Sequence, residues 1–200
     1  MNLQLPRMTA WAHMFLRQTL RSGDCAVDLT AGKGRDSLLL AELVGPTGSI
    51  LSFDIQPEAL QATASLFEEN GLTAHLWTKQ VPPPAAGTWL IGADHARLSD
   101  YLDAAPRAVT ANLGFLPGGD PTICTKVDST RQALSASLND LAVGGRIVLV
   151  VYIGHPCGRD EQVMLEQLTA DLPPRDWHAL RLQVVNRQDA PYLLVLEKRR

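Results

Sequence analysis

The segment CAVDLTAGKGRDSLLLAELV, residues 25–44, decides how the chain is expected to fold. Residues 25–29 form a short apolar run typical of a buried strand, and residues 37–44 have the apolar pattern of a helix. Between them, Gly32 and Gly34 permit a tight turn and a close approach of the backbone to a ligand. The segment therefore predicts a nucleotide-type strand, loop and helix, although a loop that needs glycine only for its turn would look the same.

Short apolar runs alternate with helical segments along the rest of the chain. Further strands are expected at residues 49–53, 88–92, 108–112, 146–152, 179–185 and 192–197, and further helices at residues 57–70, 96–103, 130–142 and 159–172. Such alternation is typical of a parallel sheet covered by helices, whereas the last two strands lack a helix between them and suit a hairpin. The predicted fold is α/β and Rossmann-like: a seven-stranded, mostly parallel sheet with helices on both faces and an antiparallel C-terminal hairpin.

The composition indicates one globular domain. Of the 200 residues, 46% are hydrophobic and 20% are charged, which suits a single core over residues 1–200. Residues 1–22 are expected to be an N-terminal helical segment, and Pro6 and Arg7 interrupt it too early for a signal peptide or membrane span. We therefore expect a cytoplasmic protein with no membrane partner. Residues 81–87, VPPPAAG, are expected to form a proline-rich surface loop.

Cysteine and charge content narrow the chemistry further. Cys25, Cys124 and Cys157 show no metal-type pairing and are odd in number, so we expect free thiols and no metal site. The net charge of -3 gives no general basic surface, so any nucleic-acid contact must use local patches. The candidate phosphate contacts are Arg7, Arg17, Arg21, Arg159 and the terminal Lys198, Arg199 and Arg200. A solvated helix face explains the early arginines equally well.

Polar residues follow several predicted strands, at the edge where such sheets bind ligands. Asp28 closes the first strand, where a buried carboxylate could accept hydrogen bonds from a ligand ammonium or from loop amides. Asp54 follows Gly34 by 20 residues, an interval typical of an acid that holds ribose hydroxyls. Asp94 and His95 follow the next strand, where a side chain can meet an adenine edge, although His95 also suits a helix start.

A glycine loop and a ribose-binding acid could serve either NAD or S-adenosylmethionine. The loop GKGRDS lacks the third glycine or alanine of the usual dinucleotide motif, although Ser37 is small enough to replace it. A nicotinamide enzyme would normally need more sheet or a substrate domain. The predicted strands, ending in a hairpin within 200 residues, instead suit the minimal fold of a class I S-adenosylmethionine-dependent methyltransferase.

Six segments together resemble one bacterial family: DLTAGKGRDS, FDIQ, DHARL, NLGFLPGGD, VVYIGHPCGRDE and NRQDAPYLLVLEKR. It is the family long labelled rRNA methylase and now associated with the tRNA 5-aminomethyl-2-thiouridine methyltransferase MnmM. The resemblance implies methylation of the aminomethyl nitrogen of the wobble uridine, position 34 of tRNA, so that the anticodon stem-loop is the expected partner. The product would be 5-methylaminomethyl-(2-thio)uridine.

The resemblance also implies a cofactor site. It implies contacts with S-adenosylmethionine from Lys33, Asp36, Asp54, Gln56, Asp94 and His95, and the full expected cofactor site adds Asp28, Thr30, Gly32, Gly34, Ile55 and Asn112. The family more often has Asn in place of Lys33 and Ser in place of Asp94. Asp36 also suits the first turn of a helix, where it would favour the helix dipole.

The segment NLGFLPGGD, residues 112–120, is the expected substrate loop. Methyl transfer to an amine needs an unprotonated, oriented nitrogen, so the site must accept a proton and offer hydrogen-bond acceptors. The expected roles are the Asn112 carbonyl as acceptor, Phe115 as a stacking face, Pro117, Gly118 and Gly119 for loop shape and close approach, and Asp120 to attract the ammonium. An irregular turn that Asp120 merely caps is the alternative.

The fifth predicted strand ends in YIGHPCG, which places Tyr152 and His155 at the same edge of the sheet. Both are expected catalytic residues, with His155 receiving the amine proton or contacting a phosphate, and Arg159 is an expected substrate contact. Cys157 is not expected to be a nucleophile, because amine methylation needs no covalent intermediate.

Other functions stay open at this point. They are an rRNA methyltransferase, a small-molecule amine or hydroxyl methyltransferase, a noncatalytic module that binds S-adenosylmethionine or RNA, and an NAD-linked oxidoreductase. The chain has little room for a lid, which favours a large substrate at an open mouth, and binding of RNA should weaken steeply with salt. The sequence also leaves open whether the chain forms a homodimer.

Overall fold

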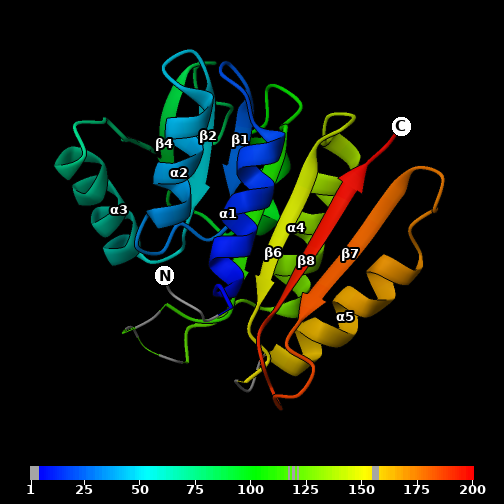
Figure 1. Ribbon diagram of the computed structural model, residues 1–200. Coiled ribbons are helices and arrows are strands. Elements are labelled where there is room, and N and C mark those ends of the chain that lie inside the picture. Colours follow the sequence, from blue (N-terminus) through cyan, green and yellow to red (C-terminus); the bar gives the residue numbers. More distant parts are fainter. Residues whose placement is uncertain (1–4, 117, 119, 121, 155–157) are drawn as a thin grey trace.

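A single sheet organises the computed structural model, which describes residues 5–116, 118, 120, 122–154 and 158–200 (Figure 1). The sheet order is β3-β4-β2-β1-β5-β6-β8-β7. The strands are β1 (Cys25–Asp28), β2 (Ser49–Phe53), β3 (His75–Trp77), β4 (Gly87–Ile91), β5 (Ala108–Leu113), β6 (Arg146–Val151), β7 (Trp177–Gln183) and β8 (Tyr192–Lys198). All pairs are parallel except those of β8, which lies antiparallel between β6 and β7.

The predicted fold class and the C-terminal hairpin are confirmed, but the number of strands is wrong: the sheet has eight strands and not seven. The missed strand is β3, which pairs with β4 at one edge of the sheet. It contains three residues, of which His75 and Leu76 are exposed. A strand this short at an edge needs no buried apolar run, so periodicity gives it no signal.

Helices cover both faces of the sheet. They are α1 (Met8–Thr19), α2 (Arg35–Val44), α3 (Pro57–Glu69), the 3-10 helix η1 (His95–Asp100), α4 (Val127–Asp140) and α5 (Gly158–Ala170). Successive side chains of β1 point to opposite faces of the sheet and so belong to two different hydrophobic clusters. Ala26 packs in the cluster of Leu16 of α1 and Leu40 of α2, whereas Val27 packs in the cluster of Leu134 of α4. The sheet is therefore buried on both sides, as parallel sheets require.

Several predicted bounds shift where tertiary contacts extend an element. The strand expected at residues 179–185 is β7 at Trp177–Gln183, because its first residues pair with the end of β8. The helix expected at residues 96–103 is instead the 3-10 helix η1, which starts at His95 and ends at Asp100. In the proline-rich segment, residues 81–86 are irregular and Gly87 already begins β4.

The thiols differ from the prediction in one case. Cys25 is a free thiol, as expected. Cys124 is disulfide-bonded, so the expectation of a free thiol is wrong for this residue. Cys157 lies outside the described residues.

The parallel strands all end on one side of the sheet, at the bottom in Figure 1. From here on, "edge" refers to this carboxyl edge or to the one opposite it, and not to the lateral edges at β3 and β7. The α1 helix begins near the carboxyl edge, and the C-terminus lies at the opposite one. Across residues 5–116, 118, 120, 122–154 and 158–200, no helix is long and apolar enough to cross a membrane.

Candidate active site

The glycine loop follows β1 and turns at Gly32 and Gly34, whose φ angles are 54° and 77°. A Cβ atom at Gly34 would lie 2.9 Å from Cα and Cγ2 of Thr63 in α3, so this glycine is required by helix packing. The amide of Gly32 donates to Asp54 Oδ2 at 2.9 Å. The loop is thereby tied to the end of β2, and the two glycines serve its shape.

Asp28 lies at the end of β1 and is fully buried. Its Oδ1 accepts from the amide of Thr30 at 3.1 Å, and its Oδ2 accepts from the hydroxyl of Ser37 at 2.6 Å. Burial, followed by the charge of Asp36, raises the pKa of Asp28 to about 7. The structure thus places Asp28 beneath the loop, where it accepts from a loop amide, one of the two partners expected for it.

Asp54 lies beside the loop at the end of β2. Its Oδ1 accepts from the amide of Gln56 at 3.0 Å, while Oδ2 holds Gly32. Gln56 precedes Pro57, the first residue of α3, and the intervening Ile55 is 57% exposed. Each oxygen of Asp54 keeps a second lone pair, so the carboxylate can still accept from ribose hydroxyls.

Three carboxylates gather at this edge of the sheet. The charges of Asp36 and Asp54 both act on Asp28 and contribute to its raised pKa. Asp36 and Asp54 add negative charge here, and Asp28 adds more once it ionises near pH 7, which favours a cationic ligand over an anionic one. A sulfonium with an α-ammonium group fits this field better than a dinucleotide with its pyrophosphate.

His95 supplies an unpartnered acceptor to the same region. Its Nδ1 lies 3.0 Å from the carbonyl of Leu29, which can only accept, so Nδ1 carries the proton. Burial lowers the pKa of His95 and keeps the ring neutral. Its Nε2 is buried and has no hydrogen-bond partner among the described residues. An exocyclic amine such as that of adenine would satisfy this lone pair, whereas neighbouring Asp94 already accepts from the amide of Ala96 at 2.9 Å.

Asp36, in the first turn of α2, joins three elements. His13 of α1 lies with Nε2 2.6 Å from Asp36 Oδ1, and Asn112 of β5 donates from Nδ2 to Asp36 Oδ2 at 2.5 Å. A carboxylate only accepts, so the amide nitrogen of Asn112 must face Asp36 and its carbonyl must face away. The backbone amide of Asn112 donates to Thr30 Oγ1 at 2.8 Å, which fixes the residue against the glycine loop.

The expected substrate loop leaves the end of β5 and returns to α4. It lies against the glycine loop at two points. A Cβ atom at Gly32 would lie 3.4 Å from Cδ1 of Leu116 in the substrate loop, and a Cβ atom at Gly118 would lie 3.7 Å from Nζ of Lys33 in the glycine loop. Lys33 is exposed and points towards the substrate loop. Phe115 is 41% exposed, as a stacking face needs to be. The two loops together form one rim of the site.

Asp120 lies in the same loop but is occupied locally. Its Oδ1 accepts from the amide of Thr122 at 2.8 Å and from the Thr122 hydroxyl at 2.7 Å. These bonds lower the pKa of Asp120. The structure therefore shows the arrangement in which Asp120 caps its own turn. Pro117, Gly119 and His155 lie outside the described residues.

Tyr152 follows β6 and is 39% exposed. Burial and the charge of Asp36 raise the pKa of Tyr152, and the charge of Arg7 opposes them. Tyr152, Asp36 and Arg7 therefore share one electrostatic environment at the mouth of the site. Arg159 also lies beyond the carboxyl end of β6, with its side chain 74% exposed and 3.6 Å from Asp189.

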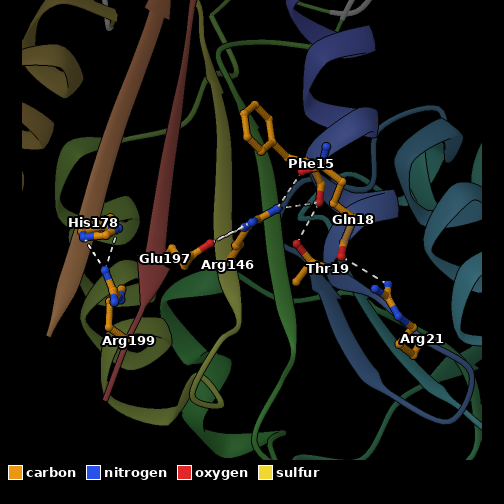
Figure 2. Close-up of polar contacts among 8 residues, drawn as sticks. All are labelled: Phe15, Gln18, Thr19, Arg21, Arg146, His178, Glu197 and Arg199. Atoms are coloured by element: carbon orange, nitrogen blue, oxygen red, sulfur yellow. Dashed lines mark hydrogen bonds and ion pairs between the residues drawn. The ribbon is translucent and has the colours of Figure 1, made fainter.

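Two of the other candidate phosphate contacts, Arg21 and Arg199, lie at the opposite edge of the sheet (Figure 2). Arg21 donates to the carbonyls of Leu20 at 2.7 Å and Gln18 at 3.2 Å. Arg199 contacts His178 at 2.7 Å. Nearby, Arg146 at the start of β6 pairs with Glu197 at 2.8 Å and donates to Gln18. Arg146 links helix α1 to the hairpin, whereas Arg21 binds carbonyls at the end of α1 and Arg199 binds β7. All three lie at the edge opposite Arg7 and Arg159.

Two residues of the site region were not predicted from the sequence. His13 is one, because its contact with Asp36 spans 23 residues and depends on how α1 packs. Glu161 is the other, a fully buried carboxylate in α5. Charged residues are rarely buried without a partner, so a glutamate at an apolar position of the α5 pattern was the available signal.

Comparison with known proteins places this geometry among methyltransferases. The family model described as "Putative rRNA methylase" matches residues 50–198, and a model described as "Methyltransferase domain" matches residues 20–76. A chloroplastic tRNA (mnm(5)s(2)U34)-methyltransferase of Arabidopsis thaliana is 35% identical over 96% of this chain and 70% of its own length.

Two solved structures are similar over nearly the whole chain. A putative rRNA methylase of Clostridium thermocellum has a TM-score of 0.87 at 30% identity, covering 98% of this chain and 100% of that one. A putative methyltransferase of Streptococcus mutans, solved in complex with S-adenosylhomocysteine, has a TM-score of 0.83 at 26% identity, covering 98% and 99%.

Fold and site together define a class I S-adenosylmethionine-dependent methyltransferase. The described residues fit that cofactor. They provide a glycine loop, negative charge for its sulfonium and ammonium groups, and the unpartnered Nε2 of His95 for the exocyclic amine of its adenine. The chain belongs to the family of the model that covers most of its length, the Putative rRNA methylases.

Proposed function

We propose that this protein methylates the aminomethyl nitrogen of 5-aminomethyl-(2-thio)uridine at the wobble position of tRNA, giving the 5-methylaminomethyl derivative. The observation that carries the proposal is the pairing of Asn112 with Asp36 beside the glycine loop. The Arabidopsis relative, named for a modified uridine of this kind, supports the choice of substrate.

The Asn112–Asp36 pair suits a cationic amine. The Nδ2–H of Asn112 is engaged by Asp36 at 2.5 Å, so the Asn112 carbonyl is the end of the amide that faces the substrate side. Asp36 has a side chain only 12% exposed and keeps lone pairs beyond those used by His13 and Asn112. An ammonium group placed here gains a carboxylate and a carbonyl acceptor, whereas an anionic or purely apolar group would leave both unsatisfied.

The reaction needs little more than orientation from these residues. S-adenosylmethionine supplies an electrophilic methyl group on a positively charged sulfur. The amine must first lose a proton to solvent, because a protonated nitrogen has no lone pair. Its attack would then form the new C–N bond as the C–S bond breaks, with S-adenosylhomocysteine as the leaving group. We assign Asn112 and Asp36 to hold two N–H groups of the substrate, so that the lone pair left by deprotonation points at the methyl group. The charge of Asp36 acts on Tyr152, and we assign Tyr152 a contact with the same nitrogen or with the base that carries it.

The RNA would lie across the rim formed by the substrate loop. Exposed Phe115 offers a stacking face for a splayed base, and Arg7, Lys33 and Arg159 offer positive charge at the same edge of the sheet. We propose that these residues receive the anticodon stem-loop. Arg21 and Arg199 lie at the opposite edge and are assigned no part in it.

Nucleoside mass spectrometry provides the test. Purified protein and S-adenosylmethionine are incubated with tRNA that carries 5-aminomethyl-uridine at the wobble position, and the conversion to the methylaminomethyl form is measured. Asn112→Ala and Asp36→Asn should lower the single-turnover rate by about a hundredfold or more, since each removes a contact to the reacting nitrogen. Asn139→Ala is the matched control, because Asn139 is exposed on α4.

Two outcomes would contradict the proposal in different ways. If the wild-type protein binds S-adenosylmethionine but leaves this tRNA unmodified, the substrate is another RNA or a small amine. If tRNA is converted and Asn112→Ala is as fast as Asn139→Ala, the reaction stands and the assigned site is wrong.

A further inference from the structure

Glu161 is a buried charge that the proposed reaction does not use. It lies in the first turn of α5, and its exposed area is zero. Its Oε2 accepts from the hydroxyl of Thr125 at 2.8 Å, and its Oε1 accepts from the hydroxyl of Thr130 at 2.7 Å. A buried carboxylate is costly unless hydrogen-bonded, so both threonines are needed to keep it in place.

Thr125 connects Glu161 to the substrate loop. The amide of Gly114 donates to Thr125 Oγ1 at 2.9 Å, and the amide of Thr125 donates to the carbonyl of Gly114 at 2.9 Å. These two bonds close the loop at its base, directly after β5. The next pair inward, Phe115 and Cys124, forms an antiparallel bridge. The Thr125 hydroxyl therefore accepts a hydrogen bond from the Gly114 amide and donates one to Glu161.

The Gly114 N–H can only donate, and Glu161 accepts from the hydroxyls of Thr125 and Thr130. Thr125 Oγ1 is therefore the group that links the loop backbone to Glu161. Thr130 belongs to α4 and fixes the other oxygen of Glu161. Helices α4 and α5 thus set the position of Glu161, and Glu161 in turn sets the base of the loop that carries Phe115.

The loop so held reaches both parts of the site. Asn112 lies two residues before its base, and Leu116 faces Gly32 of the glycine loop. A shift of the Gly114–Thr125 pair would move Phe115 and Leu116 together, whereas Asp54 follows β2, His95 begins η1, and both bond to residues that follow β1. Loss of the anchor should therefore act on the substrate side and spare cofactor binding.

We propose that Glu161 is a positioning residue for methyl transfer, which holds the substrate loop at Gly114 and Thr125 in the shape that receives the target base. The proposal rests on the function proposed above for what the loop binds, and on the hydrogen bonds of Thr125 for how Glu161 acts on the loop, beside the disulfide of Cys124.

The central experiment compares four variants. Glu161→Gln replaces one acceptor oxygen by a donor, Thr125→Val removes the hydroxyl, and Thr125→Ser restores it. Glu166→Gln is the matched control, since Glu166 lies on the same helix and pairs with exposed Arg181 at 2.9 Å. Each variant is measured for the single-turnover rate and KM with tRNA, the Kd for S-adenosylmethionine, and hydrogen exchange of the Gly114 and Thr125 amides.

Glu161→Gln and Thr125→Val should lower kcat/KM for tRNA by about tenfold or more, as expected when one buried hydrogen bond is lost. The Kd for S-adenosylmethionine should stay within about twofold of wild type, and exchange at the two amides should rise by about tenfold. Thr125→Ser and Glu166→Gln should match the wild type. A double variant with Glu161→Gln and Thr125→Val should be little worse than either single one.

Three results would overturn the proposal. Unchanged exchange at Gly114 and Thr125 in Glu161→Gln would show that the loop does not depend on this anchor. Equal losses of tRNA turnover and cofactor affinity would indicate a general loss of structure. A Thr125→Ser protein as slow as Thr125→Val would exclude the hydroxyl. If the wild-type protein modifies no tRNA, the proposed function fails, yet the exchange measurement still decides whether Glu161 holds the loop.

Discussion

Replacing Asp28 by asparagine tests whether the negative charge of this residue lowers the free energy of unfolding. Asp28 is fully buried, and its two oxygens accept from Thr30 N and Ser37 Oγ. In Asp28→Asn the carbonyl can still accept from Thr30, and the amide nitrogen can donate to the Ser37 hydroxyl, which can rotate to accept. The substitution therefore keeps the hydrogen bonds and removes only the charge.

The magnitude follows from the pKa. Burial and Asp36 raise the pKa of Asp28 from 3.8 to about 7, so between these values the folded protein keeps a proton that the unfolded chain has lost. Stability must then fall as the pH rises through this window and level off above about pH 7. A rise of about three pKa units corresponds to a loss of at most about 4 kcal/mol. Asp28→Asn escapes this loss, and it should exceed the wild type in stability at about pH 8.

Urea unfolding at about pH 5 and about pH 8 measures this difference, with Asp103→Asn as an exposed control. The difference in unfolding free energy between Asp28→Asn and wild type should grow by roughly 2 to 4 kcal/mol between the two pH values. Calorimetry should show weaker binding of S-adenosylmethionine to Asp28→Asn at the higher pH. A difference that is the same at both pH values would refute the assignment of a protonated, buried Asp28.

Three further predictions concern single contacts. His13→Leu should lower the turnover of tRNA by about tenfold because Asp36 loses a hydrogen bond, while His13→Gln should retain part of it, and single-turnover rates measure both. Lys33→Gln should reduce the slope of log K for tRNA against log salt by about 0.7 to 0.9 if the lysine contacts a phosphate, with the Kd for S-adenosylmethionine unchanged; an unaltered slope excludes that contact. Gly34→Ala should destabilise the protein by about 2 kcal/mol or more in urea unfolding, because its Cβ would clash with Thr63 at positive φ; wild-type stability would contradict the packing.

The sheet could be predicted because alternating apolar runs and helices leave few other arrangements. That logic also placed Asp54 and His95 together, since parallel strands bring their carboxyl ends to one edge. It could not find β3, whose three residues bury no apolar face and form a strand only because β4 lies beside them. Nor could it find the contact between His13 and Asp36, which exists only once α1 has packed across the sheet.

The arginines show a second limit of sequence-based prediction, because residues that look alike in the sequence can have different roles in the structure. In the sequence, Arg7 and Arg21 look alike, as basic residues flanking one helical segment. In the structure α1 runs from the site to the opposite edge, so its two ends face different surroundings. Arg7 acts on Tyr152, whereas Arg21 caps the end of the helix by binding the carbonyl of Leu20. Charge alone predicts a surface, and only the path of the helix separates a ligand contact from a structural one.

The distribution of charge also explains how one site can attract two positively charged reactants, the sulfonium cofactor and the substrate amine. Burial, and after it the charges of Asp36 and Asp54, raise the pKa of Asp28 to about 7, so Asp28 keeps its proton up to about that pH. A cationic cofactor stabilises the ionised form of Asp28, so its binding should release a proton near neutral pH and tighten as the pH rises. His13 and Asn112 fix Asp36 from two sides, in the position that we propose faces the substrate amine. On the proposed function, the negative charge of these carboxylates is what attracts both positively charged reactants to the same edge of the sheet.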